Sequence, residues 1–169
     1  ILGPGDDTDR FIYWIERVRR GGEVLGPPNR HFEWQWVDAR NLCPWLVQLA
    51  EQDRAGTFNA AGPAAATTRE QVLHGLQALT AEPVRFHWPS PELVQELRIP
   101  MPMIPTRAGS IHFASEAALA AGLKFRPLAD TATAMSDWWH ALPQERRTAE
   151  QKNWPTAEQE ATAIARMRT

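Results

Sequence analysis

The sequence predicts an α/β fold, in which short strands alternate with amphipathic helices. Two observations lead to this prediction. Apolar residues recur at helical spacing in several stretches, and short runs rich in aromatic and β-branched residues stand between them. Neither an internal repeat nor a low-complexity linker divides the 169 residues. A chain of this length buries about 70% of the surface that its unfolded form exposes, so we expect a substantial core.

Seven segments are predicted to be helices, because each has apolar residues along one face and a suitable residue at its start. Asp38 is a good N-cap for one of them, and Pro91 occupies the first helical position of another, where proline is favoured. The predicted helices cover approximately residues 9–20, 38–49, 68–79, 91–97, 115–121, 129–142 and 156–168.

Four short segments are predicted to be extended, at residues 23–25, 32–37, 56–60 and 83–88. Residues 32–37 alternate aromatic or apolar with polar side chains, which is typical of a half-buried strand. Ile1 to Gly3 reads as the end of a further strand, buried in a sheet, that runs into a Gly/Pro turn. Because such a strand needs neighbours, we expect the chain to be one part of a longer protein.

The composition excludes several classes of protein. The net charge is −2, so no overall field attracts nucleic acid or anionic lipid. Cys43 is the single cysteine, and the five histidines lack metal-ligand spacing, so neither a disulfide framework nor a metal site is expected. No apolar run is long enough for a membrane helix, and we expect a cytoplasmic protein.

Four segments taken together resemble one protein family. They are Gly3–Asp6, Phe32–Asn41, Gly56–Gly62 and Ala118–Leu128, in that order along the chain. The last reads Ala-x-x-x-Gly-x-x-x-Arg-Pro-Leu. A similar motif closes the substrate region in extended short-chain dehydrogenases/reductases of the NAD-dependent epimerase/dehydratase group. The members that resemble isoflavone reductase look most similar to this chain.

The resemblance implies an arrangement in three parts. Residues 1–62 would complete the edge of a Rossmann-like sheet, residues 63–142 would form a small substrate-binding lobe, and residues 143–169 a peripheral helical tail. It also implies NAD or NADP as the cofactor of the intact enzyme. The reaction would be hydride transfer at a hydroxyl or carbonyl carbon of a small-molecule substrate, and the resemblance allows a homodimer.

Two parts of the family's machinery are absent from this sequence. One is the Gly-rich turn that holds the cofactor pyrophosphate, and the other is the catalytic Tyr-x-x-x-Lys. Tyr13 and Arg17 have the spacing of the second motif, but an arginine stays protonated and cannot be tuned as that lysine is. We therefore interpret them as a structural helix pair. We predict no catalytic residue in this chain and expect the catalytic groups in a missing N-terminal Rossmann half.

Candidate binding residues follow from the resemblance and from the residue types. Gly3 and Pro4 would border the cofactor, because ligands of open α/β sheets lie at the carboxyl ends of strands. Asp6 and Arg10, in the turn that follows, would contact the substrate, although capping and turn formation would also explain them.

Three further residues complete the predicted substrate site. Trp34 and Trp36 lie two residues apart, hence on one face of a strand, and would form either an aromatic wall of the substrate cleft or part of the core. Arg107 would bind a carboxylate or phosphate, unless it is a surface arginine. We interpret Asp38 and Arg40 as a structural pair in which the acid caps a helix.

Two other functions remain open from the sequence. A non-catalytic relative that binds NAD(P) and regulates a partner would lack the upstream Tyr-x-x-x-Lys. A standalone binding or interaction module would present its tryptophans as a partner surface and would unfold cooperatively by itself.

Overall fold

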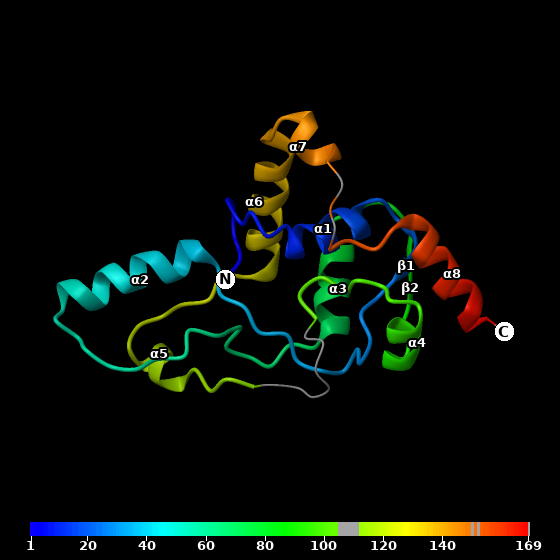
Figure 1. Cartoon of the computed structure of the whole chain (residues 1–169). Coiled ribbons are helices and arrows are strands. Elements are labelled where there is room, and N and C mark those ends of the chain that lie inside the picture. The colour runs from blue at the N-terminus through cyan, green and yellow to red at the C-terminus, as the bar shows by residue number, and fades with distance from the viewer. Residues whose placement is uncertain (105–111, 150, 152, 169) are drawn as a thin grey trace.

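Helices dominate the part of the chain that the computed structural model describes, which is residues 1–104, 112–149, 151 and 153–168. In chain order the elements are α1 (Arg10–Arg19), β1 (Gly22–Leu25), α2 (Ala39–Glu51), α3 (Arg69–Gln77), β2 (Val84–His87), α4 (Pro91–Glu96), α5 (Glu116–Ala120), α6 (Leu128–Ala141), α7 (Gln144–Thr148) and α8 (Ala157–Met167). Figure 1 shows α1, α3 and α6 side by side, and the α1–α3, α1–α6 and α3–α6 pairs are all in contact. The arrangement is a mixed α/β fold, as the sequence predicts.

The side chain of the N-cap residue caps α2, α3, α4 and α8, whereas Asp9 makes no such hydrogen bond at the start of α1. The Thr68 hydroxyl accepts a hydrogen bond from the Gln71 amide, and the Gln71 side chain accepts one from the Thr68 amide, so α3 starts with a complete capping box. Thr156 and Gln159 repeat this arrangement at the start of α8. All seven predicted helices are confirmed to within a few residues, and α7 is an additional short helix that was not predicted.

The sheet is smaller than predicted. β1 and β2 pair in parallel, with Gly22 opposite Val84 and Leu25 opposite His87. Residues 32–37 form no regular strand and pair through isolated antiparallel bridges, Glu33 with Thr68 and Trp36 with Gly62.

The spacing of the backbone hydrogen bonds explains this difference. The Trp36 amide donates to the Gly62 carbonyl at 2.7 Å, and the Trp34 amide donates to the Thr67 carbonyl at 2.9 Å. The step from Trp34 to Trp36 is therefore two residues, whereas the step from Gly62 to Thr67 is five. The extra residues in the second segment interrupt the ladder. Residues 56–60 also form no strand, because no described segment pairs with their backbone.

The main core surrounds α1, whose Phe11, Ile12 and Trp14 are fully buried. A second cluster lies in an arm formed by α2, the following segment and α5, where Trp45 and Leu49 pack against Leu123. A third cluster joins α8 to the sheet through Ile164 and Leu25. No helix in the described ranges is long and apolar enough to cross a lipid bilayer.

Candidate functional site

The N-terminal segment lies beside the start of α2. The Leu2 amide donates to the Val37 carbonyl and the Ala39 amide donates to the Leu2 carbonyl, both at 2.8 Å, so Leu2 and Asp38 form a parallel bridge. Leu2 is 3% exposed but Ile1 is 71% exposed, so the strand predicted at residues 1–3 is reduced to a single bridge at Leu2. Because the two segments run in parallel, the turn that starts at Gly3 and the N-terminus of α2 meet at one edge.

Glycine is required at position 3 of this turn. Its φ angle of 137° falls where residues with a side chain are rarely found, and a Cβ atom there would lie 3.4 Å from Oδ1 of Asp38. The backbone of the turn can therefore approach the carboxylate closely. Gly5, which also has a positive φ angle, would have no neighbouring atom within 4 Å of a Cβ, so this side of the turn is open.

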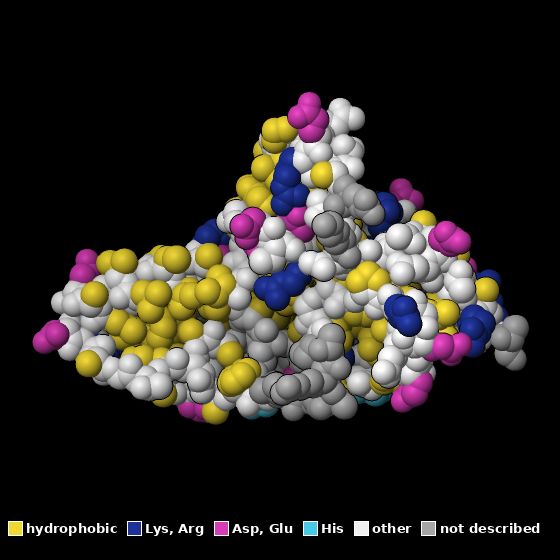
Figure 2. Space-filling model, in the orientation of Figure 1, with side chains coloured by type: hydrophobic (Ala, Val, Ile, Leu, Met, Phe, Trp, Pro, Cys, Tyr) yellow, Lys and Arg dark blue, Asp and Glu magenta, His cyan; other side chains and the backbone are white. Residues whose placement is uncertain are grey.

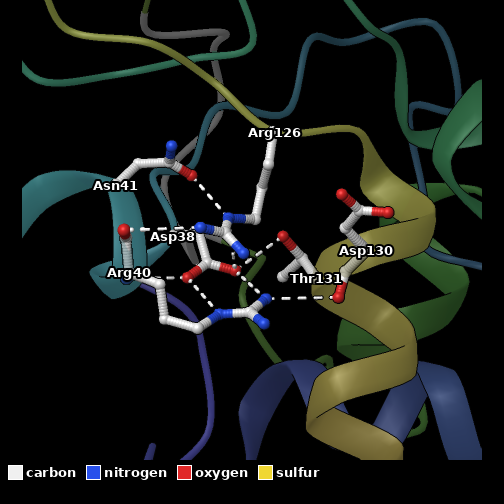
Figure 3. A network of polar contacts seen from close by, with 6 residues as sticks. All are labelled: Asp38, Arg40, Asn41, Arg126, Asp130 and Thr131. Atoms are coloured by element: carbon white, nitrogen blue, oxygen red, sulfur yellow. Dashed lines mark hydrogen bonds and ion pairs between the residues drawn. The ribbon is translucent and has the colours of Figure 1, made fainter.

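Asp38 is at the centre of a polar network that joins three parts of the chain (Figure 3). Its Oδ1 accepts hydrogen bonds from the amide and Nε of Arg40 at 2.8 and 2.9 Å. Its Oδ2 accepts from Nη2 of Arg40 at 2.6 Å and from the Thr131 hydroxyl at 2.8 Å. The carboxylate thus caps α2, forms a bidentate ion pair and holds the start of α6.

Arg126, from the Arg-Pro-Leu motif, adds a second guanidinium to this network. Its Nε donates to Oδ1 of Asn41 at 2.6 Å and lies 3.7 Å from Oδ2 of Asp38. Its Nη2 donates to the Arg40 carbonyl at 3.3 Å. The motif that carries the family resemblance therefore contacts the Asp38 turn directly.

The environment keeps Asp38 ionised. Burial by itself raises the pKa of this carboxyl. The hydrogen bonds from Arg40 and Thr131, together with the charge of Arg40, outweigh burial and lower the pKa below its ordinary value. A fully hydrogen-bonded carboxylate that stays charged at neutral pH is suited to fixing the backbone around it and unsuited to proton transfer. The geometry agrees with the structural interpretation of Asp38 and Arg40.

The predicted substrate residues Asp6 and Arg10 lie at this same turn. Oδ1 of Asp6 accepts hydrogen bonds from the Thr8 amide at 3.1 Å and from the Thr8 hydroxyl at 2.6 Å, and Nε of Arg10 donates to that hydroxyl at 3.1 Å. Pro4 is exposed and Gly3 is buried. The structure thus brings Gly3, Pro4, Asp6 and Arg10 together, and their binding roles stay predictions.

Trp34 and Trp36 lie in the main core, 5% and 8% exposed. Both contact Phe11, Trp34 edge-on at 6.1 Å between ring centroids and Trp36 stacked at 6.5 Å. Core packing therefore accounts for most of their surface, and a contact with substrate stays a prediction. Arg107 lies outside the described residues. All eight tryptophans are buried or half-buried, an arrangement that leaves little aromatic surface for a partner.

Tyr13 and Arg17 form a buried cluster with Glu160 of α8. The Tyr13 hydroxyl donates to Oε1 of Glu160 at 2.8 Å, and Nε of Arg17 donates to Oε2 at 2.7 Å. Arg17 also donates to the carbonyls of Gly21 and Glu23, at the start of β1. These contacts fit the structural interpretation of Tyr13 and Arg17, and Glu160 is the residue that the sequence did not single out.

Tyr13 provides a prediction for alkaline pH. Burial, with the neighbouring Glu160 carboxylate, raises the pKa of its hydroxyl far above the ordinary value of about 10. Because the folded-state pKa is the raised one, the stabilisation is fully present below about pH 10 and is lost as the pH rises further. We expect the free energy of unfolding to fall less between pH 9 and pH 11 in Tyr13→Phe than in the wild type. Tyr13 is the only tyrosine, so phenolate absorbance reports its ionisation directly, and absorbance titrating near pH 10 in the folded chain would contradict the prediction.

The described residues contain no group of three or more His, Cys, Asp or Glu side chains that could hold a metal ion. In comparisons with known proteins, no family model, no curated protein and no solved structure matches the chain.

Proposed function

We propose that the chain is the substrate-binding part of an NAD(P)-dependent oxidoreductase or epimerase of the extended short-chain dehydrogenase/reductase type. The cofactor, NAD or NADP, would supply or accept a hydride at a hydroxyl or carbonyl carbon of a small molecule. This chain would contribute the walls of the substrate pocket. The proton-transferring tyrosine and lysine, and the glycines that hold the cofactor, would belong to a nucleotide-binding half.

The observation that carries the proposal is the parallel bridge between Leu2 and Asp38. In open α/β sheets, ligands lie at the carboxyl ends of parallel strands, where one strand turns toward its helix. The bridge gives the turn from Gly3 to Gly5 and the N-terminus of α2 the relative placement that such an edge would require. The Asp38 network fixes the N-terminus of α2, and the backbone bridge at Leu2 joins the turn to it, so a cofactor bound beside Gly3 and Pro4 would meet a backbone that is held in place.

A second observation supports a partner that covers α2. This helix has a wide apolar face beside a polar strip formed by Arg40, Gln48 and Glu51, and an apolar face of that kind is normally buried. One side packs in the arm through Trp45 and Leu49, whereas Leu46 and Val47 are 50% and 56% exposed. Figure 2 shows apolar side chains gathered over the α2 and α5 arm. Since α2 directly follows a segment paired in parallel, a parallel sheet of the nucleotide-binding half is the partner that we propose for this face.

The proposal is tested by the coding sequence upstream of Ile1 and by cofactor binding. We expect an upstream Gly-rich turn after a strand and a Tyr-x-x-x-Lys, and we expect the protein encoded by the extended frame to bind NADH or NADPH with a change in nicotinamide fluorescence. An upstream sequence without either motif, or a protein that binds neither cofactor, would exclude the enzyme. A sequence with the glycines but without Tyr-x-x-x-Lys would favour an NAD(P)-sensing regulator.

The exposed side of α2 yields a separate prediction. In the 169-residue chain, Leu46→Glu should change the free energy of unfolding by no more than about 0.5 kcal/mol, because the side chain is half exposed. In the protein extended by the nucleotide-binding half, the same substitution would bury a charge. It should then cost about 2–4 kcal/mol, measured by urea unfolding.

The matched control is Leu79→Glu, which changes a leucine of similar exposure (46%) outside α2. It should have a small effect in both proteins. Equal, small effects of Leu46→Glu in both would contradict the docking of α2 on the other half.

A further inference from the structure

Two buried side-chain donors close to the bridge between Glu33 and Thr68 have no hydrogen-bond partner among the described residues. They are Nε of Arg69 and Nε1 of Trp34. Arg69 is 4% exposed and Trp34 is 5% exposed. Buried N–H groups are nearly always satisfied in native proteins, so two unsatisfied donors in one region call for an acceptor.

The backbone pairing places these two residues close together. The Arg69 amide donates to the Phe32 carbonyl at 3.0 Å, and the Trp34 amide donates to the Thr67 carbonyl. Arg69 is thus opposite Phe32 and diagonal to Trp34, a relation that separates Cβ atoms by about 7–8 Å or less. The guanidinium carbon of Arg69 lies 5.5 Å from the centre of the Phe32 ring, which puts it on the side of the segment that Phe32 and Trp34 share.

The charge of Arg69 is not balanced. Its Nη1 donates to the Pro28 carbonyl at 2.6 Å, but no carboxylate in the described ranges pairs with it. Burial lowers the pKa of this guanidinium, with no opposing charge to restore it. A water molecule would satisfy a donor without supplying negative charge, whereas an anionic oxygen would do both.

We propose that Arg69 and Trp34 form a binding site for an anionic oxygen group, a carboxylate or a phosphate, of a small molecule. The aromatic rings around Trp34, which are those of Phe11 and Trp14, make the surroundings apolar and strengthen an ion pair there. If the bound anion is the enzyme's substrate, the substrate is an anionic molecule, and this part of the inference rests on the proposed function. Anion binding itself does not depend on the cofactor.

The test is thermal unfolding of the full chain in the presence of benzoate or inorganic phosphate, with the neutral analogue benzamide as the control ligand. We expect the Tm to rise by about 5–10 °C at a concentration of one hundred times Kd. A rise with benzoate alone identifies a carboxylate site, and a rise with phosphate alone identifies a phosphate site. No rise with either anion, or an equal rise with benzamide, would overturn the proposal.

Three variants separate binding from a structural role. Arg69→Met should abolish the rise without lowering the Tm in buffer, because an apolar side chain removes an unbalanced buried charge. Trp34→Phe should weaken anion affinity about tenfold by removing one donor, and Arg54→Met, at an exposed arginine, should leave the rise unchanged. A Tm several degrees lower for Arg69→Met in buffer would mean that Arg69 serves only to hold Pro28. Because no nicotinamide is present, these results do not depend on whether the upstream sequence encodes a cofactor site.

Discussion

Replacing Asp38 by alanine is expected to lower the free energy of unfolding by about 2–3 kcal/mol, through the lost helix cap and the lost hydrogen bonds of a charged group. The substitution removes the cap of α2 and leaves Arg40 and Arg126 facing each other without the carboxylate between them. It also frees the Thr131 hydroxyl at the start of α6. Because the three contacts come from distant parts of the chain, the loss should appear in the global unfolding transition, measured with urea.

The contribution of Asp38 to the free energy of unfolding is expected to fall at low pH. The folded-state pKa of Asp38 is lowered, so its stabilisation is present above the unfolded pKa of about 3.9 and is lost as the pH falls through the folded value. The difference in stability between the wild type and Asp38→Asn should therefore shrink below pH 4. Asp53→Asn, at an exposed aspartate in a left-handed conformation that asparagine tolerates, is the control. A difference that stays constant down to pH 2 would contradict the assigned network.

The helices could be predicted from the sequence because their signals are local. A cap, an apolar face and a terminating residue all lie within one helix, as Thr68 and Gln71 illustrate for α3. The isolated bridges could not be predicted in this way. The alternation at 32–37 is real, and Trp34 and Trp36 both face the core, but the partner segment carries five residues where two would continue the ladder.

The candidate site likewise contains some residues that could be predicted from the sequence and others that only the fold brings together. Asp38 and Arg40 are two residues apart, and a cap followed by a basic residue is visible in sequence. Thr131 and Arg126 reach the same carboxylate from more than 80 residues away, and only the fold brings them there. Arg69 begins a helix among polar residues and resembles an ordinary surface arginine, so no sequence signal marked its burial.

The C-terminal helix α8 also contains a charged residue whose burial could not be predicted from the sequence. In sequence Glu160 is one of two acidic residues at the start of α8, yet it is 6% exposed and binds both Tyr13 and Arg17. Arg17 in turn contacts two carbonyls at the start of β1. Glu160 therefore connects α8 to α1 and, through Arg17, to the sheet.

We expect Glu160→Leu to lower the free energy of unfolding by about 3–5 kcal/mol, because Arg17 would be left charged and buried. Glu158→Gln, at an exposed position in the same turn, should change the stability by no more than about 0.5 kcal/mol. The double variant Arg17→Met with Glu160→Leu should recover much of the loss, since apolar side chains of similar size can replace a buried ion pair. If the double variant were as unstable as the two single losses added together, the hydrogen bonds from Arg17 to the β1 carbonyls, and not its charge, would dominate this contact.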